Sequence, residues 1–208
     1  MAKLKITKEE KKRIEEAVIS VEKKTIGEIV PVILKESDDY PGAKLRSSIF
    51  FAFVFSFGTY WFFPFIDPLW YIASLIPGGV LGYLLANIRF LKRIFLNKKE
   101  MAEEVHQKAI QAFYYLDLAS TNDRTGVLLF VSILEHRVEI LADKGINQKL
   151  EDGTWQEILE HLITQIKKGN LAKGIVQAVE EIGEPLSKHF PKSPDNEDEL
   201  PNRVIIDL

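Results

Sequence analysis

The strongest constraint on this chain is an apolar block between Arg46 and Arg89, in which Asp67 is the only charged residue. Residues 47–65 form a run of 19 uncharged residues, and residues 68–88 form a run of 21. A helix rises about 1.5 Å per residue, so about 20 residues cross a hydrocarbon core about 30 Å thick. Each run is therefore long enough to span a membrane.

The short segment between the two runs indicates a tight turn, because Pro64 and Pro68 both break helices. We therefore expect a two-helix transmembrane hairpin at residues 44–97, with spans at about 47–65 and 69–89. The alternative is a buried helical pair inside a soluble domain, but soluble core helices rarely lack a polar face over two such lengths.

Basic residues flank the two predicted spans and are absent from the turn between them. They are Lys44, Arg46, Arg89, Lys92, Arg93, Lys98 and Lys99. Such residues stay on the cytoplasmic side of a membrane. We therefore expect a multi-pass protein of a bacterial inner (cytoplasmic) membrane, with both termini in the cytoplasm. Gly78 and Gly82 would let the two helices approach closely.

The sequence on either side of the block indicates α/β structure. Thr7 begins a capping-box pattern that predicts the start of a helix. Residues 28–34 are rich in β-branched side chains and predict a strand, which Pro31 places at a sheet edge or a bulge because it lacks an amide donor. Further strands are expected at residues 127–134 and 137–142, with helices before and after them.

Neither flanking segment is large enough to bury a core alone. Joined, residues 1–43 and 98–190 have the size of a typical single domain, with about three strands and four helices. The hairpin is therefore predicted to be an insertion in one domain, which is tolerated because loop-closure entropy grows slowly with length. Residues 191–208 are predicted to be a mobile acidic tail, whose apolar residues 204–206 would be able to dock.

Two short motifs and the order of the elements carry a family resemblance. The motifs are Thr25, Gly27, Glu28 and Ile29 around the first strand, and Thr-Gly-Val-Leu-Leu at residues 125–129. With them the chain resembles the TPM domain, named after thylakoid-lumen, photosystem II repair and nematode acetylcholine-receptor modulator proteins. The resemblance implies an αβα sandwich with a small mixed sheet, and membrane association. In some members it also implies weak acid-phosphatase activity or calcium binding by acidic loop residues.

Composition excludes several kinds of chemistry. The chain has no cysteine, which excludes disulfides, thiolate catalysis, thiolate zinc sites and iron–sulfur clusters. Its net charge of −3 argues against a nucleic-acid partner. The sequence signatures of dinucleotide sites, phosphate loops, zinc proteases and serine hydrolases are absent.

Polar side chains at two strand ends are the candidates for a functional site. Asn122 and Asp123 lie in the loop that enters the central strand, Arg124 follows them, and Asp143 ends the next strand. In antiparallel neighbours these two ends meet, so the groups would converge. Oxygen ligands suit hard cations such as Ca²⁺ or Mg²⁺. We therefore take Asn122, Asp123 and Asp143 as candidate metal ligands, and Asp123, Arg124 and Asp143 as candidate catalytic residues.

The alternative for this cluster is purely structural. In that case Asp123 caps a turn, Asp143 accepts backbone amides in its own loop, and Arg124 is a surface charge. Glu28 and Glu135 are further candidate carboxylates, although Glu135 belongs to the opposite end of the strand pair.

Two functions remain open. The first is a non-enzymatic membrane protein whose TPM-like domain faces the cytoplasm and binds membrane protein partners or assists their assembly. It needs the lipid bilayer and a protein partner, but no nucleic acid and no cofactor. The alternative is a weak acid phosphatase that depends on Ca²⁺ or Mg²⁺, in which Asp123 and Asp143 hold the metal and Arg124 steadies a phosphate.

Overall fold

The computed structural model describes residues 6–151, 153–192, 199–201 and 203–207. Its internal contacts divide the chain into two compact units. Unit 1 combines Met1–Ser37 with Glu104–Leu208, and unit 2 is Asp38–Glu103. Segments from both ends of the chain therefore share unit 1.

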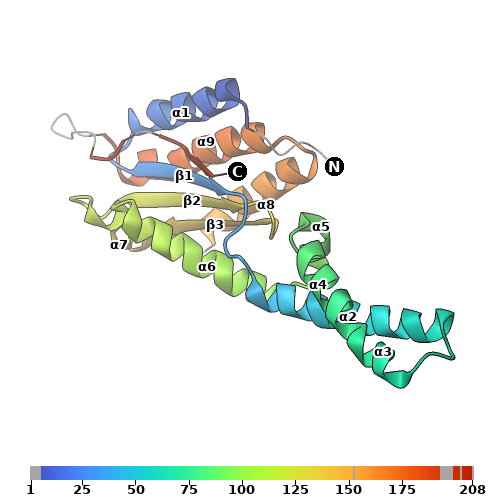
Figure 1. The fold of residues 1–208 in the computed structure, drawn as a ribbon. Coiled ribbons are helices and arrows are strands. Elements are labelled where there is room, and N and C mark those ends of the chain that lie inside the picture. Colours follow the sequence, from blue (N-terminus) through green and yellow to red (C-terminus); the bar gives the residue numbers. More distant parts are fainter. Residues whose placement is uncertain (1–5, 152, 193–198, 202, 208) are drawn as a thin grey trace. The chain divides into compact units, whose positions relative to one another are not determined.

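Unit 1 is built on a four-stranded mixed sheet with the order β3-β2-β1-β4 (Figure 1). The strands are β1 (Glu28–Leu34), β2 (Gly126–Ser132), β3 (Arg137–Ala142) and β4 (Ile205–Asp207). β1 pairs in parallel with both β2 and β4, whereas β2 and β3 form an antiparallel hairpin. The predicted hairpin of strands is confirmed, and β2 is buried along its whole length, as its continuous apolar run indicates.

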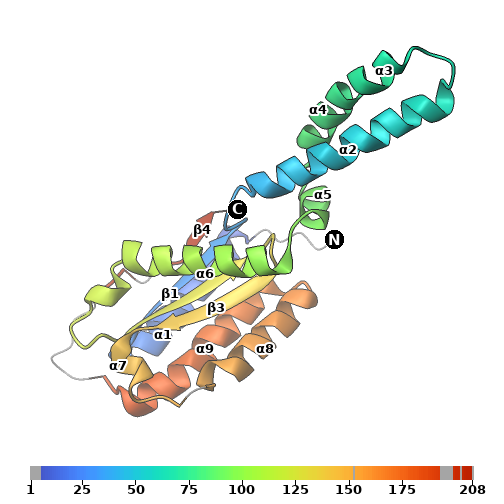
Figure 2. The same ribbon diagram turned by 90° about the horizontal axis from the view of Figure 1, so that it is seen from below.

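Helices cover both faces of this sheet (Figures 1 and 2). The helices of unit 1 are α1 (Lys8–Glu22), the greater part of α6 (Lys98–Tyr115), the short 3-10 helix η1 (Leu118–Ser120), α7 (Lys144–Asn147), α8 (Thr154–Lys167) and α9 (Leu171–His189). Side chains alternate along β2: Val127, Leu129 and Val131 join the core with α1, α8 and α9, while Leu128 and Phe130 face α6. The predicted mixed α/β fold with a small sheet is confirmed.

β1 is an inner strand, so the edge position predicted from Pro31 is wrong. The Lys35 N–H donates to the Asp207 carbonyl at 2.6 Å, so the odd-numbered residues of β1 direct their N–H groups towards β4. Pro31 has no N–H to offer on that side, and the Ile29 N–H already donates to the Glu22 carboxylate at 2.8 Å. β4 therefore pairs with β1 only beyond the proline.

The C-terminal segment docks on unit 1 instead of forming a free tail. The Glu199 N–H donates to the Glu28 carboxylate at the start of β1 (3.3 Å), and β4 pairs with the end of the same strand. Val204, between these points, is 2% exposed and belongs to the main core. We call residues 199–201 and 203–207 the C-terminal strap. Residues 193–198, which hold most of the predicted acidic run, lie outside the described residues.

Unit 2 is helical. Its helices are α2 (Pro41–Phe62), α3 (Pro68–Ala73), α4 (Leu75–Leu85) and α5 (Arg89–Ile94). α2 ends before the predicted residue 65, because Phe63 precedes Pro64 and the residue before a proline disfavours the helical conformation. α3 and α4 are nearly continuous. The interruption lies where Pro77 lacks the N–H that would bond the Ala73 carbonyl.

Candidate functional site

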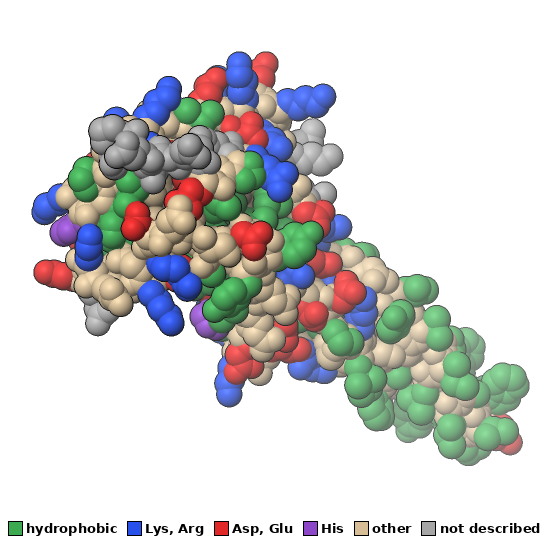
Figure 3. Space-filling model, turned by 90° about the vertical axis from the view of Figure 1, so that its left-hand side faces the viewer, with side chains coloured by type: hydrophobic (Ala, Val, Ile, Leu, Met, Phe, Trp, Pro, Cys, Tyr) green, Lys and Arg blue, Asp and Glu red, His purple; other side chains and the backbone are tan. Residues whose placement is uncertain are grey.

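Unit 2 exposes most of its large apolar side chains, which gather over its helices in Figure 3. Phe65 in the turn is 99% exposed, and Phe62, Leu69 and Ile76 on the helices are also exposed. Soluble monomers rarely expose contiguous apolar patches larger than a few hundred Å². A surface of this kind marks contact with a membrane or with another protein.

One stretch of unit 2, Pro68–Leu85, is long and apolar enough to cross a membrane, and 17% of it is buried. α2 is long enough to cross a membrane but is not apolar enough. Every 18-residue stretch within its 22 residues contains Arg46, and its last two turns contain polar and small residues. The prediction of two membrane-spanning helices is therefore not confirmed, and a single candidate span stands among the described residues.

α2 and α4 pack closely through glycine. A Cβ atom added to Gly78 would lie 2.6 Å from the Phe55 Cβ, and one added to Gly82 would lie 2.5 Å from the Ser47 carbonyl oxygen. These distances are too short for any side chain larger than hydrogen. The close approach predicted from the spacing of the two glycines is confirmed.

Hydroxyl groups of unit 2 donate to backbone carbonyls. Ser47 donates to Gly82 (2.8 Å) and Ser48 to Gly79 (2.9 Å), both across the helix pair. Further donations run from Ser56 and Ser74 to Tyr71, from Thr59 to Phe55, and from Tyr71 to Phe63. These polar groups are hydrogen-bonded within the protein and do not need water as a partner. Polar groups inside a hydrocarbon layer must be satisfied in this way, because no water is available there.

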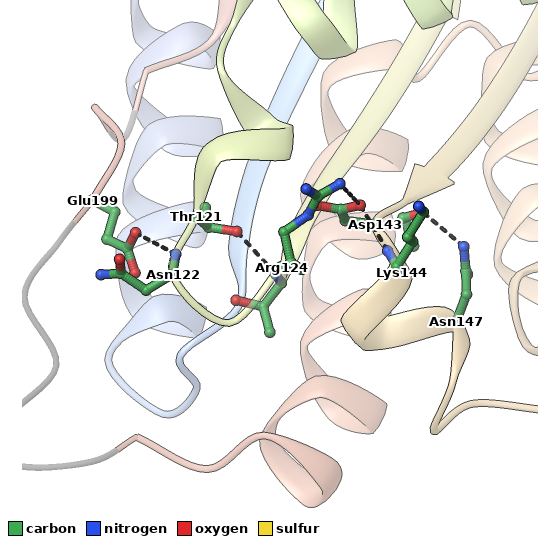
Figure 4. A network of polar contacts seen from close by, with 9 residues as sticks. Thr121, Asn122, Arg124, Asp143, Lys144, Asn147 and Glu199 are labelled. Carbon is green, nitrogen blue, oxygen red and sulfur yellow. Dashed lines mark hydrogen bonds and ion pairs between the residues drawn. The ribbon is translucent and has the colours of Figure 1, made fainter.

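In unit 1, the end of the sheet where β2 begins holds a polar network (Figure 4). Arg124 donates to both carboxylate oxygens of Asp143, from Nε at 2.6 Å and from Nη2 at 2.9 Å. Asp143 is 5% exposed, and it also accepts from the Lys144 N–H at 2.7 Å as the N-cap of α7. Arg124 has a φ of 57°, a left-handed conformation that is uncommon outside glycine.

The electrostatics of the pair favour both charged forms. Burial of Asp143 opposes its ionisation, but the hydrogen bonds from Arg124 and from the Lys144 N–H, together with the nearby positive charges, outweigh burial and lower its pKa. The hydrogen bond to Asp143 likewise raises the pKa of Arg124. The pair is therefore ionised at neutral pH.

The structure brings together only some of the candidate residues. Asp143 and the loop of residues 121–124 do meet at one end of the sheet, because the Gly145 N–H donates to the Arg124 carbonyl at 3.1 Å. The partner of Asp143 is Arg124, whereas the side chain of Asp123 is exposed. Asn122 contributes its N–H to Glu199 of the strap at 2.9 Å.

The two further carboxylates are both buried, and both hold backbone groups. Glu28 accepts from the strap, as described above. Glu135 lies at the opposite end of the strand pair, as predicted, where it accepts from the Ser37 N–H at 2.9 Å and from the Ser132 hydroxyl. It therefore joins the end of β1 to the β2–β3 turn.

The donor set does not fit a metal ion. Both oxygens of Asp143 are engaged by a guanidinium group, and the Asp123 carboxylate does not join them. Within the described residues, no group of three or more His, Asp or Glu side chains is arranged to hold a metal. What the arrangement does provide is an ion pair with two hydrogen bonds that connects the β2 entry loop to α7.

Two contacts of this region were not predicted. The sequence places Glu199 in a mobile tail, but its carboxylate accepts from the Asn122 N–H; the Glu22 carboxylate accepts from the Ile29 N–H. Glu22 at the end of an amphipathic helix carries no signal that separates it from a surface residue. Only the tertiary structure shows that Glu22 and Glu28 are both buried.

Replacing Asp143 by alanine is expected to lower the free energy of unfolding by about 1–2 kcal/mol at pH 7, since it removes a helix cap and a charged acceptor. Because the folded-state pKa of Asp143 is lowered, its stabilisation is complete above the ordinary value of about 3.9 and is lost as the pH falls through the folded value. Denaturant unfolding at pH 7 and at pH 3 measures both effects. Asp123→Ala is the control and should change stability by less than about 0.5 kcal/mol.

Replacing Glu135 by glutamine is expected to lower the free energy of unfolding by about 1 kcal/mol, because an amide is a weaker acceptor for the Ser37 N–H and the Ser132 hydroxyl. Hydrogen exchange should show the loss first at the end of β1. Glu16→Gln, on the exposed face of α1, should leave both measurements unchanged. Equal effects of the two substitutions would contradict the structural role of Glu135.

Unit 1 is thus a mixed α/β domain, an αβα sandwich with the Arg124–Asp143 ion pair at the start of its central strand. Residues 94–184 match the family model of the TPM domain. This match spans less than half of the chain, and over residues 94–184 it confirms the resemblance to the TPM domain found in the sequence.

One solved structure extends this comparison to almost the whole chain. It is the NMR structure of the BA42 protein from the psychrophilic bacterium Bizionia argentinensis, with 25% sequence identity and a TM-score of 0.62. The similarity covers 98% of this chain and 96% of that one. A search of curated proteins found no match.

Proposed function

We propose that this protein is an integral membrane protein whose unit 2 lies in the bilayer as a helical hairpin and whose TPM domain binds or helps to assemble a membrane protein partner at the cytoplasmic face. The observation that carries the proposal is the apolar surface of unit 2. Its side chains face outward while its hydroxyl groups bond inward to carbonyls. Water is a poor solvent for such a surface, and lipid is a good one.

The dimensions of the two helical stretches support an inserted pair. α2 has 22 residues and Pro68–Leu85 has 18, which correspond to lengths of about 33 and 27 Å. Both are close to the thickness of a hydrocarbon core, about 30 Å. Trp61 and Trp70 are exposed near the turn, where an aromatic belt would meet the far membrane surface.

Charge supports the orientation. The basic residues of unit 2 lie before and after the apolar stretches, and the turn carries only Asp67. Arg46 is paired with Glu100 at 2.5 Å, so the beginning of α2 and the start of α6 are joined by an ion pair at the basic end. The positive-inside rule then places both chain ends in the cytoplasm.

A binding role has more support than a phosphatase role. The oxygens of Asp143 that would hold a metal are instead bonded to Arg124, and Asp123 stands apart from them. The rigid sheet and its ion pair therefore serve as a scaffold in this proposal. The hairpin keeps that scaffold beside the membrane, where its partner lies.

The absence of cysteine allows a clean test of insertion and orientation. Single cysteines are introduced by Phe65→Cys in the turn, Glu9→Cys in α1 and Lys173→Cys in α9. We expect a membrane-impermeant maleimide to label the turn cysteine in intact bacterial cells, and to label the other two only after permeabilisation. Recovery of the chain in the soluble fraction, or labelling of Glu9→Cys or Lys173→Cys in intact cells, would contradict the proposal.

The partner is tested by mild detergent extraction from native membranes followed by native mass spectrometry. We expect a reproducible complex with a membrane protein, and its loss when the hairpin is intact but unit 1 is unfolded by a core substitution such as Phe130→Ala. Clean monomeric protein in repeated preparations would count against partner binding while leaving membrane insertion unaffected.

A further inference from the structure

The α6 face of the sheet carries an apolar hollow that the proposed function does not use. Its volume is about 620 Å³, within the range of 300–1,000 Å³ that small-molecule sites occupy. Val32 and Leu34 of β1 and Ile205 of β4 line it from the sheet, and Ala112 and Tyr115 line it from α6. The hollow lies entirely within unit 1.

The hollow exists because this face of the sheet is covered unequally. α6 is the helix that covers it, whereas α1, α8 and α9 cover the opposite face (Figures 1 and 2). The strip of sheet beside α6, towards β4, is therefore left open to the surface. Tyr115 stands beside it with 86% of its surface exposed.

One cation lies in the lining. Lys108 of α6 is half-buried, and no carboxylate of the described residues pairs with it. Its neighbours in the lining are aliphatic except for Gln111 and the two tyrosines, Tyr114 and Tyr115. An apolar cavity with a single positive charge matches a ligand that has one apolar chain and one negative head.

We propose that this hollow binds a single-chain fatty acid, with the chain along β1 and β4 and the carboxylate at Lys108. The apolar lining would remove the chain from water, at about 25 cal/mol per Å² of buried surface. The ammonium group of Lys108 would form a charge-assisted hydrogen bond with the carboxylate. The proposal concerns unit 1 alone and does not depend on insertion of unit 2.

The test uses the full-length protein in lipid nanodiscs with a diazirine-bearing fatty acid as the probe. After irradiation, labelled peptides are mapped by mass spectrometry. We expect labelling on α6 and around β1 and β4, displaced by excess oleate but several-fold less well by oleyl alcohol. Labelling confined to unit 2, or equal displacement by the alcohol and by a diacyl phospholipid, would overturn the proposal.

Two variants address the hollow directly. Ala112→Trp fills it and should lower labelling of unit 1 about tenfold, and Lys108→Glu should lower it about three- to fivefold. Lys173→Glu, on the exposed surface of α9, is the charge-matched control and should have no effect. Circular dichroism checks that each variant folds. If Ala112→Trp does not fold, Lys108→Glu decides alone, and unchanged labelling of either folded variant would refute the site.

Discussion

Replacing Gly82 by leucine is expected to separate α2 from α4. A Cβ atom at this position would lie 2.5 Å from the Ser47 carbonyl oxygen, 2.8 Å from the Phe51 Cβ and 2.9 Å from the Ser48 Cα. Two of these three atoms belong to backbone, so they cannot move without displacing the helix. Overpacking of this kind costs about 1–3 kcal/mol, and the displaced helices would also lose the hydrogen bond from Ser47 to Gly82.

The cysteine-free chain allows this separation to be measured as a disulfide yield. A Cβ atom at Gly79 would lie 3.3 Å from the Ser48 hydroxyl oxygen, so the pair Ser48→Cys and Gly79→Cys should oxidise readily. Adding Gly82→Leu should reduce the yield severalfold. Gly58→Leu is the matched control, because a Cβ atom there meets nothing within 4 Å. If both leucines had the same effect, the glycine contact would not hold the helix pair together.

Replacing Val204 by aspartate is expected to release the C-terminal strap. Val204 is 2% exposed, and its N–H donates to the Glu15 carboxylate of α1 at 3.4 Å. A carboxylate at this position would be buried in the core next to another acidic group, so the strap would detach instead of burying the charge. The loss in free energy of unfolding is then limited to the docking energy of the strap, about 1.5–3 kcal/mol for the burial of one valine.

Hydrogen exchange distinguishes this outcome from general unfolding. In the Val204→Asp variant, the amides of β4 and of Lys35 should lose protection, while those of β2 keep it. Arg203→Asp places the same charge one residue earlier, at an exposed position, and should leave β4 protected. Loss of protection throughout the sheet in Val204→Asp would show that the strap is an integral part of the core.

Local sequence signals predicted most of the secondary structure. The capping box at Thr7 forms with both of its hydrogen bonds, and the strands at residues 28–34 and 137–142 have the predicted limits. These signals depend on neighbours within four residues or on the alternation of a strand. They therefore hold whatever the rest of the chain does.

The predictions were wrong where the end of a helix or the position of a strand in the sheet depends on more than composition. The apolar run predicted a helical span up to residue 65, but α2 ends at Phe62. Hydropathy does not show that Pro64 disfavours the helical conformation of the residue before it. Pro31 correctly indicated a missing donor, but its effect was to delay the pairing of β4 and not to place β1 at the edge. Which strand fills an edge depends on a segment more than 170 residues away.

At the candidate site, the sequence correctly placed Asp143 and the loop of residues 121–124 at the same end of the sheet. It did not reveal that Arg124 would take both oxygens of Asp143, or that Glu199 would reach Asn122. Side-chain pairing across separate elements depends on distances of a few tenths of an ångström. Those distances follow from how the helices and strands pack, which residue spacing does not specify.

The sequence by itself determined that this chain carries a long apolar block with a single charged residue, that its other segments alternate as an α/β domain does, and that cysteine chemistry is excluded. These are properties of residue type and spacing, which act locally. Only the tertiary structure decided that the C-terminal strap completes the sheet, that the candidate acid is held by an arginine, and that an open strip remains beside α6. Each of these depends on long-range packing, where the free energy comes from surfaces that residues distant in sequence bury together.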